Sequence, residues 1–115
     1  LSGELVPGAI FSKRQPKKRA AAFNIRPQVR FDNEASATAT LIEVEGADRP
    51  GLLYDVARAI FESGLSMSSA IVATYGERAV DVFYVRDGFG HKIVHPDRQE
   101  SVRARIVKAM APEGP

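Results

Sequence analysis

The segment EVEGADRPGLLY, residues 43–54, has the residue types best suited to binding a small charged ligand. Gly51 falls at the start of a predicted helix and leaves the backbone bare, so a small anion can reach the free N–H groups there. The positive end of the helix dipole favours the same anion. Asp48, just before this point, can accept a backbone N–H as a helix cap. The segment therefore predicts a ligand site.

Three elements must position this site. A strand over residues 38–45 is expected to bury Thr40, Ile42 and Val44 on one face, and Gly46 is expected to take turn angles after it. A helix over residues 50–63 follows, with Pro50 at its first position. Gly64 is its predicted stop. The predicted buried stripe of this helix is Leu53, Val56, Ala57, Ile60 and Phe61.

Two further strands and a second helix follow. Residues 65–74 alternate as a strand, and residues 79–85 return as a strand that is apolar on both faces apart from Asp81. Two-sided apolarity predicts a central strand, covered by helices on one face and by a partner on the other. The second helix opens at Pro96, where Asp97 and Glu100 have capping-box spacing.

A short extended stretch over residues 27–32 precedes a turn and is expected to form a hairpin with the 38–45 strand. The order strand, strand, helix, strand, strand, helix then matches a split βαβ plan that lacks its last strand. The predicted fold class is α+β and ferredoxin-like, a four-stranded antiparallel sheet with two helices on one face. We expect the 27–32 strand to replace the missing last strand, giving the order 1-2-4-3.

Composition restricts the class of protein. The chain has 115 residues, 44% of them apolar, and no cysteine. Disulfides and thiolate metal sites are thereby excluded, and a cytoplasmic location is expected. His91 and His95 lie on a predicted loop without acidic neighbours placed as ligands, so we expect no metal site. No membrane span is expected, and because the chain starts at Leu1 rather than Met, we expect a piece of a longer protein.

The charge is unevenly distributed. Residues 1–30 carry seven Lys and Arg against one Glu, and the whole chain has a net charge of +2. We predict a basic linker or arm over residues 1–26, an ordered domain over residues 27–111 and a tail over residues 112–115. A nucleic-acid-binding arm is the alternative, but the acidic domain behind it argues against nucleic acid.

The motif DRPGLL, residues 48–53, between a strand and a helix of this plan, resembles the ACT domain, a regulatory module that binds small molecules. Longer strings are more specific: IEVEGADRPGLLY (residues 42–54), SSAIVATYGERAVDVFYVRD (residues 68–87) and GHKI (residues 90–93). They resemble the C-terminal ACT domain of bacterial bifunctional uridylyltransferase/uridylyl-removing enzymes. The resemblance covers about residues 17–110.

The resemblance implies a parent enzyme that modifies the nitrogen-signalling protein PII with UTP and a divalent metal (Mg or Mn), and that removes UMP in a second domain. Neither catalytic domain is expected in this chain, which would instead sense L-glutamine. Related ACT domains bind ligands at domain junctions, between this turn of one copy and the third strand of another. The partner would therefore be another ACT domain, either a tandem copy or a second subunit.

Glutamine chemistry fits these residues. The amides of Gly51, Leu52 and Leu53 suit its carboxylate, and Asp48 suits its ammonium group. Hydroxyls at the start of the third strand suit its side-chain amide, although a solvated edge strand is the alternative interpretation. The predicted ligand-binding residues are Asp48, Arg49, Pro50, Gly51, Leu52, Leu53, Ser66, Ser68 and Ser69.

Other function classes remain open at this point. The domain could be a ligand-free interaction module that pairs with other domains. An acylphosphatase-like hydrolase needs an Arg-bearing anion loop and an Asn that orients water. Arg49 is in the right turn, but Asn24 and Asn33 are both N-terminal. Arg49 and Arg78 could also serve only to keep edges soluble.

Overall fold

The computed structural model describes residues 25–111 of the chain. The predicted basic arm lies outside this range except for Ile25 and Arg26, and the predicted tail lies wholly outside it.

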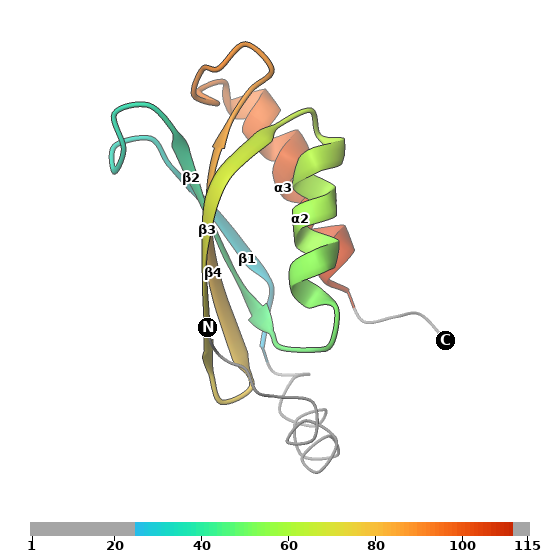
Figure 1. The fold of residues 1–115 in the computed structure, drawn as a ribbon. Helices are drawn as coiled ribbons and strands as arrows, with labels where there is room; N and C mark the ends of the chain where they lie inside the picture. Colours follow the sequence, from blue (N-terminus) through green and yellow to red (C-terminus); the bar gives the residue numbers. More distant parts are fainter. Residues whose placement is uncertain (1–24, 112–115) are drawn as a thin grey trace.

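One antiparallel sheet with the strand order β1-β2-β4-β3 forms the centre of the domain. Both helices lie on the same side of this sheet (Figure 1). The predicted fold class and strand order are therefore confirmed. The elements are β1 (Gln28–Asp32), β2 (Thr40–Ala47), α2 (Leu52–Glu62), β3 (Ser66–Tyr75), β4 (Arg78–Arg86) and α3 (Pro96–Met110).

β1 fills the edge position next to β2. The two strands form an antiparallel hairpin in which Val29 lies opposite Val44 and Arg30 lies opposite Glu43. Arg30 and Glu43 form an ion pair across the strands. The N-terminal strand thus occupies the place of the missing last strand, as the sequence predicts.

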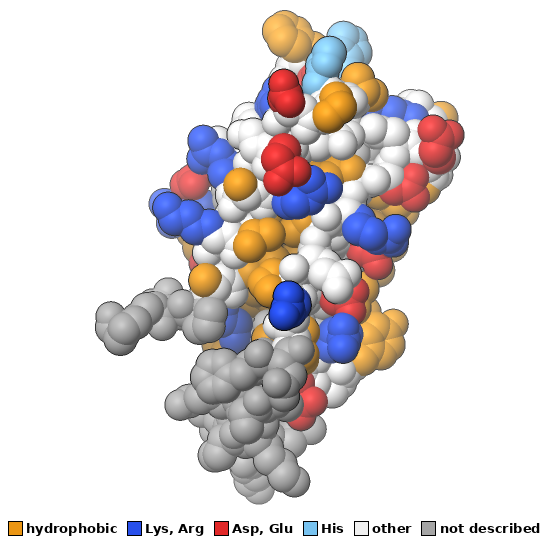
Figure 2. All heavy atoms as spheres, turned by 180° about the vertical axis from the view of Figure 1, so that it is seen from behind, with side chains coloured by type: hydrophobic (Ala, Val, Ile, Leu, Met, Phe, Trp, Pro, Cys, Tyr) orange, Lys and Arg blue, Asp and Glu red, His pale blue; other side chains and the backbone are white. Residues whose placement is uncertain are grey.

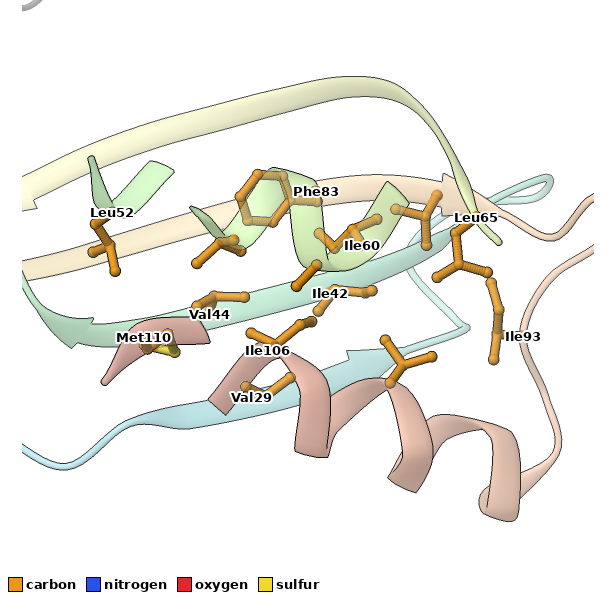
Figure 3. Packing of buried hydrophobic residues seen from close by; sticks show 14 of the residues in the cluster. Val29, Ile42, Val44, Leu52, Ile60, Leu65, Phe83, Ile93, Ile106 and Met110 are labelled. Atoms are coloured by element: carbon orange, nitrogen blue, oxygen red, sulfur yellow. The ribbon is translucent and has the colours of Figure 1, made fainter. Parts of the chain in front are cut away.

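The core lies between the sheet and the helices. Alternate residues of β2 and β4 are buried, as expected for strands with one face on a core. Figure 3 shows their side chains pointing toward those of α2 and α3. Labelled members of this cluster are Val29, Ile42, Val44, Leu52, Ile60, Leu65, Phe83, Ile93, Ile106 and Met110.

The predicted buried face of α2 is partly wrong. Leu53 is 42% exposed and Phe61 is 72% exposed, whereas Leu52 and Ala59 are buried. Leu52 and Leu53 are both apolar, so periodicity alone does not decide which of them faces the sheet. The helix is rotated so that Leu52 packs one turn before Val56.

The prediction that Gly46 makes a turn is also wrong. Gly46 lies within β2 and is buried. A Cβ atom there would clash with the terminal methyl group of Met110. Gly46 therefore gives the end of α3 room to pack against the sheet.

A β-bulge changes the predicted alternation of β3. Met67 lies opposite Val85, but the next paired residue is Ser69, opposite Tyr84. The extra residue reverses the faces beyond it. Met67 packs against the core, whereas Ile71 lies opposite Val82, on the face of the sheet without helices.

The predicted capping box of α3 is absent. The helix begins at Pro96, its N-cap is His95, and no side chain makes a cap hydrogen bond. Asp97 lies inside the first turn, where a carboxylate still interacts favourably with the helix dipole. Neither helix of the described residues is long and apolar enough to cross a membrane.

Candidate functional site

The segment between β2 and α2 folds into a turn of definite type. The Leu52 N–H donates to the Arg49 carbonyl at 3.2 Å, and Gly51 has φ 79° and ψ −1°. These angles match the third residue of a type II turn, with Pro50 at the second position. Gly51 is the N-cap of α2, so Pro50 lies before the helix and not at its first position as predicted.

The hydrogen bonds of this turn occupy one of the predicted amide donors. The Leu52 N–H is engaged within the turn, so a ligand would compete with that bond. The Asp55 N–H closes the first helical turn on the Gly51 carbonyl at 2.9 Å. The role predicted for the Gly51 and Leu53 amides at the positive end of the helix stays a prediction.

Arg49 connects the turn to both helices. Its guanidinium donates to the Pro50 carbonyl at 3.0 Å and to the Ala109 carbonyl at 2.8 Å, near the end of α3. It also pairs with Asp55 of α2 at 2.9 Å. Carbonyl groups at a helix C-terminus favour such a cation. Arg49 therefore positions the turn, a role that sequence reasoning missed because its partner is 60 residues away.

Asp48 anchors the other side of the turn. Its backbone N–H donates to the Glu77 carbonyl at 2.8 Å, in the connection between β3 and β4. The predicted turn residues are thus held next to the end of β3 that finishes at Tyr75.

Asp81 is a buried carboxylic acid that the sequence analysis did not count as a site residue. It is 2% exposed and lies on β4, opposite Val44 and Val72. Burial raises the pKa of Asp81 from 3.8 to about 6, the Ala73 N–H opposes the increase, and the charge of Asp48 adds to it. Its Oδ1 atom has no hydrogen-bond partner among the described residues. The sequence marks this residue in one way, because Asp81 is the one carboxylate in an otherwise apolar predicted strand, residues 79–85.

The predicted serines lie at the opposite end of the domain. Ser66 is opposite Arg86, whereas the Asp48 turn lies by the Tyr75 end of β3. The eleven residues of α2 separate the two ends by about 16 Å along the helix axis. Ser66, Ser68 and Ser69 are all exposed. One chain therefore does not bring the serines to the turn.

β3 itself is an open edge. It is the last strand of the sheet and none of its ten residues is buried. Ile71, Val72 and Tyr75 are each more than half exposed. Exposed apolar edge strands favour pairing with another strand.

No group of three or more His, Asp or Glu side chains in residues 25–111 is arranged to hold a metal ion. Arg78 forms an ion pair with Glu45 across the sheet.

Comparison with known protein families decides which class of domain this is. The family model described as "ACR9-like, ACT-like domain" matches residues 28–113, most of the chain. The chain belongs to the ACT-like domain family. The open β3 edge and the β2–α2 turn are therefore features of an ACT-like domain.

Curated relatives of this ACT-like domain carry the name bifunctional uridylyltransferase/uridylyl-removing enzyme. The one from Azospirillum brasilense is 48% identical over 96% of the chain, and the one from Ruegeria pomeroyi is 45% identical over 96%. The Zymomonas mobilis relative is 50% identical over 79% of the chain. The chain spans 12% of the length of the first two and 10% of the third. The resemblance stated from the motifs is confirmed.

Proposed function

We propose that this ACT-like domain senses L-glutamine and regulates the opposed activities of a bifunctional uridylyltransferase/uridylyl-removing enzyme in nitrogen regulation. The remainder of that enzyme, a cytoplasmic protein, would act on PII with UTP and a divalent metal. The observation that supports the proposal is that the predicted turn residues and the predicted serines, two proposed half-sites, lie at opposite ends of an open edge strand.

Pairing through β3 unites the half-sites. An antiparallel, two-fold contact between two β3 strands centred near Ile71 places Ser68 of the partner subunit opposite Thr74. Since β3 ends beside the Asp48 turn, the start of the partner's strand then approaches that turn. The same contact gives the exposed side chains of Ile71 and Val72 cross-strand neighbours.

Each part of glutamine then has a complementary group. The α-carboxylate faces the positive end of α2 and the amides of Gly51 and Leu53. The ammonium group pairs with Asp48. The neutral side-chain amide meets hydroxyl groups rather than a cation, which selects glutamine over glutamate. Binding would stabilise the paired arrangement, and this is how the catalytic domains would sense occupancy.

Calorimetry with glutamine and glutamate tests the proposal, on this chain and on the full-length enzyme. We expect saturable heat with glutamine, and at least a tenfold weaker affinity in Asp48→Asn and in Ser68→Ala. Asp97→Asn on the exposed first turn of α3 is the matched control and should bind normally. If neither this chain nor the full-length enzyme bound glutamine saturably, glutamine sensing would be refuted.

A ligand-free interaction module is the second candidate function, because the apolar β3 edge alone favours pairing. It predicts association that glutamine leaves unchanged.

A further inference from the structure

A groove of about 800 Å³ lies between α2 and α3. These helices lie on the same side of the sheet (Figure 1). No residue of β3 lines the groove, so it is separate from that edge strand. Its walls are formed by Arg49, Asp55, Arg58, Ala59, Glu62, Ser101, Ala104, Arg105, Lys108, Ala109 and Ala111.

The charges of the groove are not balanced. Its two acidic residues are already paired, Asp55 with Arg49 and Glu62 with Arg58, each at 2.9 Å. The side chains of Arg105 and Lys108 make no ion pair or hydrogen bond with another described residue. They are three residues apart on one face of α3, where like charges repel each other. An anionic partner would relieve that repulsion.

The remaining groove residues are small. Four of the eleven lining residues are alanine and one is serine. Ser101, Ala104 and Ala111 follow a spacing of three and then seven residues, which places them in one stripe along the axis of α3 and its end. Small side chains on a helix surface allow another helix to approach closely.

The lining also distinguishes between classes of ligand. It contains no aromatic or large aliphatic side chain, whereas sites for small organic molecules are mostly apolar. The same lack of aromatic groups disfavours single-stranded nucleic acid, whose bases stack on aromatic rings. An acidic polypeptide needs only cations and close approach.

We propose that the groove between α2 and α3 docks an acidic helix of a partner protein or domain, whose carboxylates pair with Arg105 and Lys108. The helix would pack on the small side chains as a third member of a helical layer. No β3 residue lines the groove, so this interaction does not require β3 pairing.

The test uses the full chain, isotope-labelled, and a synthetic helical peptide of about 15 residues with Glu on one face and Ala on the other. We expect chemical-shift changes that concentrate on the groove residues. Arg105→Glu should weaken binding at least tenfold. Arg26→Glu makes the same charge change at an exposed residue outside the groove, and should have much less effect.

A second pair of variants tests packing without changing charge. Ala104→Leu fills the groove at an exposed position and should weaken binding, whereas Ala37→Leu, equally exposed and elsewhere, should not. Absence of binding would overturn the proposal. Equal weakening by Arg105→Glu and Arg26→Glu would also overturn it, because the peptide would then be attracted by the general charge of the chain. Equal affinity for a peptide with Gln in place of Glu would overturn it too, because charge would then have no role in binding.

Discussion

The two edges of the sheet differ in how completely they are covered. On the β1 edge, the Arg103 side chain donates to the Val29 carbonyl at 3.0 Å and lies over the Phe31 ring at 5.3 Å. Figure 2, viewed from the side where β1 and α3 are nearest, shows hydrophobic side chains bordered by charged ones. On the β3 edge, no residue is buried. Among the described residues, α3 therefore covers part of the β1 edge, whereas the β3 edge is exposed.

Two buried polar side chains, Thr40 and Asp81, also differ in whether their hydrogen bonds are satisfied. Thr40, on β2 beside β1, accepts a hydrogen bond from the Ile93 N–H at 2.8 Å and donates to the Asn33 side chain. Asp81, on β4 beside β3, has an oxygen atom without a partner among the described residues. Thr40 is thus satisfied by its neighbours, whereas Asp81 is not, and Asp81 lies beside β3, the predicted pairing strand.

The largest predicted effect concerns Asp81. Because its pKa is raised to about 6, the folded chain binds a proton more tightly than the unfolded chain between about pH 4 and pH 6. Its contribution to stability therefore falls as the pH rises through that range, by about 3 kcal/mol in total. Asp81→Asn should be more stable than the native chain at pH 8 and similar at pH 4, measured by urea unfolding at both values.

Glu34→Gln is the control for this prediction, because Glu34 is exposed. A stability difference between Asp81→Asn and the native chain that does not change with pH would contradict the account.

The next effect concerns Thr40, the satisfied counterpart of Asp81. Thr40→Val keeps the shape of the side chain but leaves the Ile93 N–H and the Asn33 Oδ1 atom without their hydrogen bonds to Thr40. We expect a loss of about 2 kcal/mol of unfolding free energy. Thr38→Val, at an exposed position, is the control, and the measurement is chemical denaturation. If Thr40→Val left the unfolding free energy unchanged, the stability of the domain would not depend on the hydrogen bonds of Thr40.

A smaller effect on stability should follow from removing the α3 contacts to the β1 edge. Arg103→Met removes the hydrogen bond to Val29 and the contact with Phe31, so we expect a loss of about 1.5 kcal/mol. Hydrogen exchange of the β1 amides should become faster than that of β4. Arg105→Met serves as control, because the Arg105 side chain has no bond to another described residue. If Arg103→Met and Arg105→Met changed the unfolding free energy equally, the Arg103 contacts would not be what stabilises the β1 edge.

The smallest effect is expected for the ion pair between Arg30 and Glu43. Their side chains are 71% and 33% exposed, so Arg30→Gln should cost less than about 1 kcal/mol. Thermal unfolding at low and high salt checks this, since salt screening should abolish the difference. A larger, salt-independent loss would show that the β1 edge is held mainly by this pair.

Much of the fold could be predicted from local patterns. The two-sided apolarity of residues 79–85 identified β4 as a central strand, and the hairpin signal placed β1 at the edge. The rotation of α2 could not be predicted, because Leu52 and Leu53 are equally apolar. Nor could the bulge at Ser68, since the sequence around it alternates without interruption.

The candidate site was predicted in part. The turn at Asp48 was located from the order of its residue types, which constrain the backbone locally. The role of Arg49 depends on Ala109, and the burial of Asp81 depends on the packing of whole elements. Such tertiary contacts leave no local signal in the sequence.

Mixing two defective variants tests the central claim most directly. Asp48→Asn removes one proposed half-site, and the triple change Ser66→Ala, Ser68→Ala and Ser69→Ala removes the other. If each site is shared between two domains, neither variant alone binds glutamine, but an equal mixture recovers about a quarter of the native sites through mixed pairs. No recovery in the mixture, when mixed pairs are shown to form, would contradict a shared site.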